Sequence, residues 1–138
     1  MNDAAATHSL DAQNPWPGLR SFTEADSAFF FGRARETQAL LDIVQRSAVT
    51  VLYGQSGLGK TSLLRAGLFP PLKASDHLPV WVRLDHVSTA PALAHQVLNA
   101  LMTAFSRAGI EAPVPRADES LWSYFHRHDA DFWGPRNR

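Results

Sequence analysis

The chain contains no cysteine. This absence excludes disulfide bonds, thiolate metal sites and a cysteine nucleophile, and it fits the reducing cytoplasm. The chain also lacks an apolar run near the roughly 18 residues that a membrane-spanning helix needs. Its N-terminus lacks the basic and apolar regions of a secretory signal peptide. The sequence therefore predicts a cytoplasmic protein that does not bind membranes.

A net charge is absent as well. The 13 basic residues balance the 13 acidic ones, so the formal net charge is zero at neutral pH. A balanced chain has no general electrostatic attraction to nucleic acid or to an acidic membrane surface. The 138 residues, of which 45% are hydrophobic and 19% charged, suffice for one globular domain with a real core.

The most informative stretch is a glycine-rich loop at residues 54–61, GQSGLGKT, which fits the P-loop pattern G-x-x-x-x-G-K-[S/T]. Backbone N–H groups in such a loop form a concavity that binds phosphate, and its glycines allow positive φ and close approach. The lysine meets the β- and γ-phosphates, and the threonine hydroxyl binds Mg²⁺. The predicted nucleotide-binding residues here are Gly54, Gln55, Ser56, Gly57, Leu58, Gly59, Lys60, Thr61 and Ser62, with Thr61 also the magnesium ligand.

The flanks of this loop support the prediction. Residues 48–53 are apolar and β-branched, which is typical of a buried parallel strand, and residues 60–68 have leucines at helical spacing. Strand, glycine-rich loop and helix are the P-loop arrangement. Gly67 and the pair of prolines at 70 and 71 are expected to weaken or end that helix.

Alternating apolar and polar residues at 78–85 predict a second strand, nearer a sheet edge than the first. Helical periodicity predicts further helices over residues 35–45, 90–108 and 119–126. The last of these is expected to bury Leu121, Trp122 and Phe125.

The N-terminal region has two parts. Residues 1–14 are polar and rich in alanine, which is typical of a disordered leader. Residues 15–22, PWPGLRSF, combine two prolines with three large apolar side chains, so this rigid segment should lie in a groove of the body. Two interpretations stay open: the segment fastens the N-terminus to the core, or it forms a wall of a ligand site.

Three segments together resemble a known family. They are residues 14–22 (NPWPGLRSF), residues 29–36 (FFFGRARE) and the P-loop with residues 63–68 (LLRAGL) behind it. In this order they resemble the start of the STAND class of signal-transduction NTPases, most closely the bacterial "novel STAND" NTPase domain, which is often found upstream of WD repeats. The resemblance covers residues 15–138, and its first two segments are more specific than the P-loop alone.

The resemblance implies an α/β fold, the three-layer α/β/α sandwich of ASCE and AAA+-like P-loop NTPases, of which this chain would hold about two parallel strands with flanking helices. It implies ATP or ADP with Mg²⁺ as the ligand. It also places Phe30, Phe31, Gly32 and Arg33 beside the nucleotide base, and it moves residues 17–19 toward the same pocket.

The sequence departs from the family in one respect. Hydrolysis in such ATPases needs a third strand ending in acidic residues that hold Mg²⁺ and polarise water. No apolar strand here ends in a pair of acids, because Asp85 stands alone on the second predicted strand. We therefore expect residues 15–138 to be the N-terminal part of the domain, truncated before the acidic strand and belonging to a longer protein whose other domains are its partners. No catalytic residue is predicted.

Three functions remain open. The first is the ATP-binding part of a signalling switch, and the second is a nucleotide-binding scaffold without turnover. The third, a small-molecule P-loop kinase, is the least favoured, because such enzymes usually begin near the P-loop whereas 53 residues precede it here.

Overall fold

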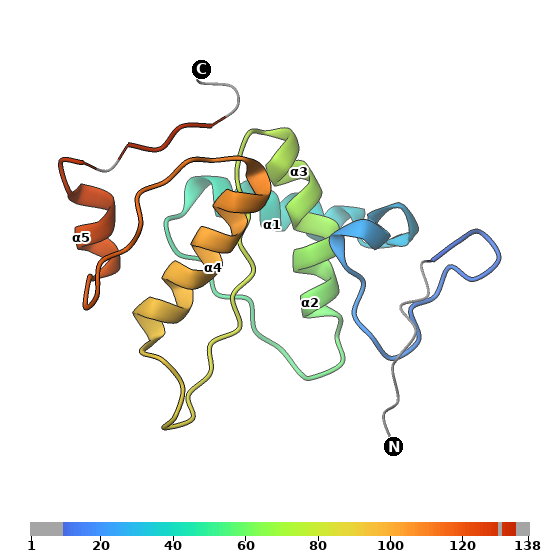
Figure 1. The fold of residues 1–138 in the computed structure, drawn as a ribbon. Coiled ribbons are helices and arrows are strands. Elements are labelled where there is room, and N and C mark those ends of the chain that lie inside the picture. The colour runs from blue at the N-terminus through green and yellow to red at the C-terminus, as the bar shows by residue number, and fades with distance from the viewer. Residues whose placement is uncertain (1–9, 130, 135–138) are drawn as a thin grey trace. The chain divides into compact units, whose positions relative to one another are not determined.

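The structure is a computed structural model that describes residues 10–129 and 131–134. The chain divides into two compact units, Met1–Pro79 and Val80–Arg138 (Figure 1). Every regular element of the described residues is helical: η1 (Glu24–Phe29), α1 (Ala34–Arg46), α2 (Lys60–Ser62), η2 (Leu63–Leu68), α3 (Phe69–Ala74), α4 (Leu93–Ala108) and α5 (Leu121–His126). Among these described helices, none has the length and apolar character needed to cross a bilayer.

The predicted α/β sandwich is wrong for this structure. The runs at residues 48–53 and 78–85, expected as parallel strands, form no strand, and pairing in the described part of the chain is limited to one antiparallel bridge between Glu111 and Trp133. A strand obtains its backbone hydrogen bonds from a neighbouring strand, and one or two strands alone are not stable in water. Neither run has a strand partner among the described residues, so neither becomes a strand.

Exposure of the first run agrees with this correction. The side chains of Val49, Val51 and Tyr53 are 81%, 76% and 88% exposed. A buried parallel strand has both of its faces covered, and this run has no such cover. Its β-branched residues favour an extended backbone, but no sheet forms from this run in the described part of the chain.

In the second unit, a side chain takes the place of a strand partner. The Gln96 amide nitrogen donates to the Asp85 carbonyl oxygen, and its amide oxygen accepts the Asp85 backbone N–H, both at 2.8 Å. Gln96 belongs to α4, so the backbone at Asp85 is satisfied by a helix. The second predicted strand thus lies beside a helix of its own unit.

The helix that follows the P-loop is longer than its sequence predicts. It starts at Lys60 and continues through α2, the π-helical segment η2 and α3 as far as Ala74. Pro70 and Pro71 do not end it. They lie directly after the π-helical segment, where the hydrogen-bond ladder is already shifted to the wider spacing, since the Phe69 N–H donates to the Leu64 carbonyl, and the helix continues past the missing proline donors.

The core of the first unit joins α1 to this long helix. Leu40 of α1 is buried with Leu63, Leu68 and Leu72, and Phe30 packs against the same cluster. The amphipathic pattern of residues 35–45 is confirmed as α1. The contact matters for function because it places the segment before α1 next to the start of the P-loop helix.

Gly67 allows this close approach. A β-carbon at Gly67 would lie 2.7 Å from Thr37 Oγ1 and 3.2 Å from Phe30 Cε1. In an open helix, replacing glycine with alanine stabilises by about 1 kcal/mol. Here we expect Gly67→Ala to destabilise the fold by about 1–3 kcal/mol, because the methyl group overpacks the contact. Urea unfolding of the variant measures this effect.

Gly134 provides the control for Gly67. Its added β-carbon would meet Ile110 Cγ1 at an ordinary 3.9 Å, so Gly134→Ala should shift the urea midpoint little. A Gly67→Ala protein more stable than the parent would show that α1 and η2 are not in this contact.

The helices of the second unit end where their sequences predict. Gly109 ends α4 in the left-handed conformation with φ of 66°, which glycine adopts without strain. The hydroxyl of Ser120 accepts the backbone N–H of Ser123 at 3.0 Å and caps α5. Leu98 of α4 and Tyr124 of α5 are the two large side chains that are fully buried among the described residues.

The predicted buried face of α5 is wrong. Trp122 is 70% exposed, and its ring stacks on that of His126 at 4.2 Å. Phe125 is also exposed, whereas Leu121 is half-buried. Tyr124 occupies the core instead, on the same side of the helix as the half-buried Leu121 three residues earlier.

Most of the predicted leader lies outside the described residues, which begin at residue 10. The described end of that segment forms a local turn, in which Asp11 Oδ1 accepts the N–H groups of Gln13 at 2.8 Å and Asn14 at 2.7 Å.

Candidate functional site

The P-loop has its lysine folded back onto it. Lys60 Nζ donates to the carbonyl oxygens of Gly54 at 3.0 Å and Gln55 at 2.7 Å. Gly57 and Gly59 have φ of 84° and 75°, so the positive φ that the pattern predicts is confirmed. An ammonium group has three donors. Two are used to close the loop, and the third can meet an anion held by the loop.

The segment before α1 reaches this loop. Arg33 Nη2 donates to the carbonyl oxygen of Leu58 at 3.4 Å, and its Nε lies 3.8 Å from the Glu36 carboxylate. The two groups of residues predicted to bind the base and the phosphates of one nucleotide are therefore in direct contact, although about 25 residues separate Arg33 from Leu58.

A cavity of about 220 Å³, here the P-loop cavity, joins these segments. It is lined by Trp16, Phe22, Phe29, Phe30, Phe31, Arg33, Gly59 and Ser62. Phe30, Phe31, Arg33, Gly59 and Ser62 were predicted from the sequence as site residues. Its volume is smaller than the roughly 300 Å³ of pockets that enclose a whole drug-sized ligand, so it suits one part of a nucleotide.

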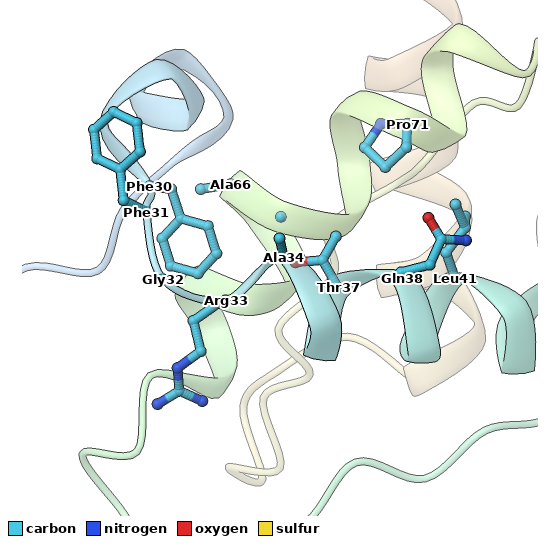
Figure 2. Close-up of a pocket in the computed structure, with 11 residues that line it drawn as sticks. Phe30, Phe31, Gly32, Arg33, Ala34, Thr37, Gln38, Leu41, Ala66 and Pro71 are labelled. Atoms are coloured by element: carbon cyan, nitrogen blue, oxygen red, sulfur yellow. The ribbon is translucent and has the colours of Figure 1, made fainter.

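A second cavity of about 370 Å³, here the helix cavity, lies along α1 and the P-loop helix. Figure 2 shows Phe30 directed between these elements, Phe31 directed away from them, and Arg33 extended toward the loop. Gly32 lines this cavity, together with Thr37 and Gln38 of α1. Phe30, Phe31 and Arg33 line both cavities.

The segment of residues 15–22, here the strap, is fastened at its C-terminal end. Arg20 donates to both carboxylate oxygens of Asp26, at 2.6 and 3.1 Å, and Thr23 donates to the same carboxylate through its N–H and its hydroxyl, at 2.8 and 2.7 Å. Asp26 is buried. The Arg20 guanidinium holds the pKa of the Asp26 carboxyl well below its usual range, with Thr23 adding to the effect and burial opposing it.

The strap also contacts the P-loop helix. The backbone N–H of Phe22 donates to Ser62 Oγ at 3.1 Å, and the Phe22 ring lies 5.5 Å from that of Phe30. The strap is thus tied to the body, as the first of the two interpretations predicted, and Trp16 and Phe22 of the strap line the P-loop cavity. Neither residue was singled out from the sequence as a site residue, although the three apolar residues of the strap were a signal.

The other predicted residues of the P-loop do not line the P-loop cavity. They belong to the loop and to the start of its helix: Gly54, Gln55, Ser56, Gly57, Leu58, Lys60 and Thr61. Thr61 is half-buried in the first helical turn. Among the described residues, no group of three or more histidine, aspartate or glutamate side chains could hold a metal ion.

The family comparison agrees with this geometry. The model of one family, Novel STAND NTPase 1, matches residues 15–130. The chain belongs to that family. The resemblance noted in the sequence is confirmed. Membership in an NTPase family indicates that the ligand of this STAND domain is a nucleotide. No curated protein and no solved structure matches the chain.

Proposed function

We propose that this STAND NTPase domain binds ATP or ADP with Mg²⁺ through residues 54–62 and serves as the nucleotide-binding part of a signalling switch. The observation that carries the proposal is the clasp of Lys60 by the loop carbonyls beside the P-loop cavity. The loop is closed around its lysine, and an aromatic cavity begins where the loop enters its helix. Phosphates and base thus have adjacent sites.

Each part of the nucleotide has its own residues in this proposal. The backbone N–H groups of the loop hold the phosphates, with the dipole of the long helix that begins at Lys60 behind them. Lys60 supplies the positive charge. Phe30, Phe31, Gly32 and Arg33 lie on the side of the base, where the P-loop cavity that Phe30, Phe31 and Arg33 line offers aromatic surface.

Magnesium fits the site through the nucleotide. Mg²⁺ takes oxygen ligands, keeps several waters and is commonly held by substrate phosphates with a few protein oxygens. Thr61 would supply one hydroxyl oxygen at the first helical turn. When bound, the ion neutralises phosphate charge. We assign no residue of this chain to hydrolysis, since a P-loop ATPase needs acidic residues for that step.

Removing the P-loop lysine tests the proposal. Lys60→Ala should weaken ATP binding at least about tenfold, the scale of one lost hydrogen bond to a charged group. Isothermal titration of the full chain with Mg-ATP measures the dissociation constant. Lys73→Ala is the matched control. Lys73 lies in α3, further along the same helix as Lys60, and it pairs with Glu24 of η1. An unchanged ATP affinity in Lys60→Ala would refute the P-loop assignment.

A further inference from the structure

We infer that the strap is the second wall of the base site: Trp16 stacks against the nucleotide base in the P-loop cavity, and the Phe22–Ser62 hydrogen bond positions it there. This inference rests on the proposed function and adds to it a base-contacting residue and a positioning residue. It also selects one cavity. The base lies in the P-loop cavity and not in the helix cavity.

Continuity with the P-loop selects the cavity. Gly59 and Ser62 line the P-loop cavity but not the helix cavity. Gly59 directly precedes Lys60, so a base in this cavity belongs to the same ligand as phosphates in the loop. In the helix cavity, the nearest residues of the P-loop helix are Ala66 and Gly67, a full helical turn further on.

The exposure of the aromatic side chains indicates which residues can contact the base. Trp16 and Phe31 are 79% and 78% exposed, although both line the P-loop cavity. Phe22 and Phe30 are turned toward each other instead, with their rings tilted at 59°. Two large aromatic faces thus stand open at one cavity from segments 15 residues apart, which is the arrangement that stacks on a flat aromatic ligand such as a purine base.

Ser62 connects the strap to the phosphate site. Its hydroxyl accepts the Phe22 N–H, and it follows Thr61 in the first turn of the P-loop helix. Ser62 is a buried residue. The position of the strap is therefore set by the same helical turn that faces the phosphates, while the Arg20–Asp26 pair secures the strap from the other side.

The test compares two ligands that share phosphates but differ in the base. Mg-ATP and Mg-tripolyphosphate are titrated against the full chain and five variants, one of which is Lys60→Ala. Trp16→Ala should weaken ATP about tenfold, the scale of one base-stacking contact, and leave tripolyphosphate within about twofold. Ser62→Ala keeps the backbone N–H of residue 62 and should weaken ATP about threefold with the same selectivity. Gln38→Ala, in the helix cavity, is the matched control and should change neither affinity.

A fourth variant keeps an aromatic ring. Trp16→Phe should retain most of the ATP affinity, while the ATP-induced change in tryptophan fluorescence is lost, because Trp16 is one of four tryptophans and would be the one in contact with the base. This pair of readouts also applies if tripolyphosphate binds too weakly to measure. If Trp16 acted only in folding, Trp16→Phe would not lose the ATP-induced fluorescence change while keeping the ATP affinity.

The outcomes separate the inference from the proposed function. Unchanged ATP affinity in Trp16→Ala, or equal weakening of both ligands, overturns the strap as a wall of the base site. ATP binding that depends on Gln38 as strongly as on Trp16 overturns the choice of cavity. In all these cases Lys60→Ala still weakens both ligands if the P-loop binds phosphate. Failure of Lys60→Ala to weaken either ligand overturns the proposed function itself.

Discussion

Asp26→Ala is expected to lower the free energy of unfolding by about 1–3 kcal/mol at pH 7. The Asp26 carboxylate is buried, but the Arg20 side chain that is left behind is 39% exposed and stays solvated, so the loss is that of charge-assisted hydrogen bonds. The substitution also leaves the N–H and hydroxyl of Thr23 without the carboxylate they contact. Urea unfolding monitored by circular dichroism measures the loss.

The same carboxylate gives a pH dependence of stability. Its pKa in the folded chain lies well below the unfolded value of about 3.9, chiefly because of Arg20. The unfolded state therefore binds the proton more readily, and the stabilisation is complete above about pH 4 and declines as the pH falls toward the folded pKa. Asp26→Asn does not titrate, so its deficit relative to the parent should be largest at neutral pH and shrink below about pH 4.

An exposed carboxylate on α1 provides the comparison. Asp42 accepts a hydrogen bond from Gln38 at 2.7 Å at the surface, and Asp42→Asn should change stability by less than about 0.5 kcal/mol at every pH. If Asp26→Asn kept a constant deficit down to pH 2, the pairing of Asp26 with Arg20 would not be the source of the stability. Because this pair secures the strap, Asp26→Ala should also weaken ATP binding.

Tyr124→Ala is expected to produce the largest loss, about 3–5 kcal/mol, which is the range for removing a buried aromatic side chain. Tyr124 is 0% exposed in the second unit. Its ring lies 5.1 Å from that of Phe125 and 5.9 Å from that of Phe132, and the Arg127 guanidinium lies over it at 5.2 Å. No other residue of α5 is buried to this extent, so the unit has no replacement for it.

Tyr124→Phe separates the contribution of the ring to stability from that of the hydroxyl. The hydroxyl donates to the Pro113 carbonyl oxygen at 2.8 Å, and losing that bond should cost about 1 kcal/mol. Trp122→Ala is the control on the exposed side of α5 and should cost much less than Tyr124→Ala. Equal losses for the two alanine variants, measured as urea midpoints by circular dichroism, would mean that α5 does not face the core through Tyr124.

Local features of this chain could be predicted from the sequence. The period of apolar residues predicted α1 and α4, and the glycine at 109 predicted the end of α4, because helix hydrogen bonds join residues close in the chain. The positive φ of Gly57 and Gly59 could be predicted for the same reason, because glycine adopts it without strain. The family could be recognised because it depends on short segments in a fixed order.

Features that depend on distant partners could not. The apolar run at residues 48–53 predicted a strand, and a strand exists only where another strand accepts its hydrogen bonds. The buried face of α5 was wrong because six residues are too few for periodicity to determine which side faces the core. The burial of Asp26 depends on Arg20, and nothing in the spacing of the two residues required them to meet.

The amino-acid sequence by itself determined the glycine-rich motif at residues 54–61, the main helices and the STAND family, since each depends on short local patterns in the chain. Only the tertiary structure decided that the strap lies against Ser62, that Arg33 reaches the Leu58 carbonyl and that Trp16 shares a cavity with Gly59. These contacts join residues about 25 to 40 positions apart. They form because α1 and the P-loop helix bury one shared leucine cluster, whose packing brings the two segments together.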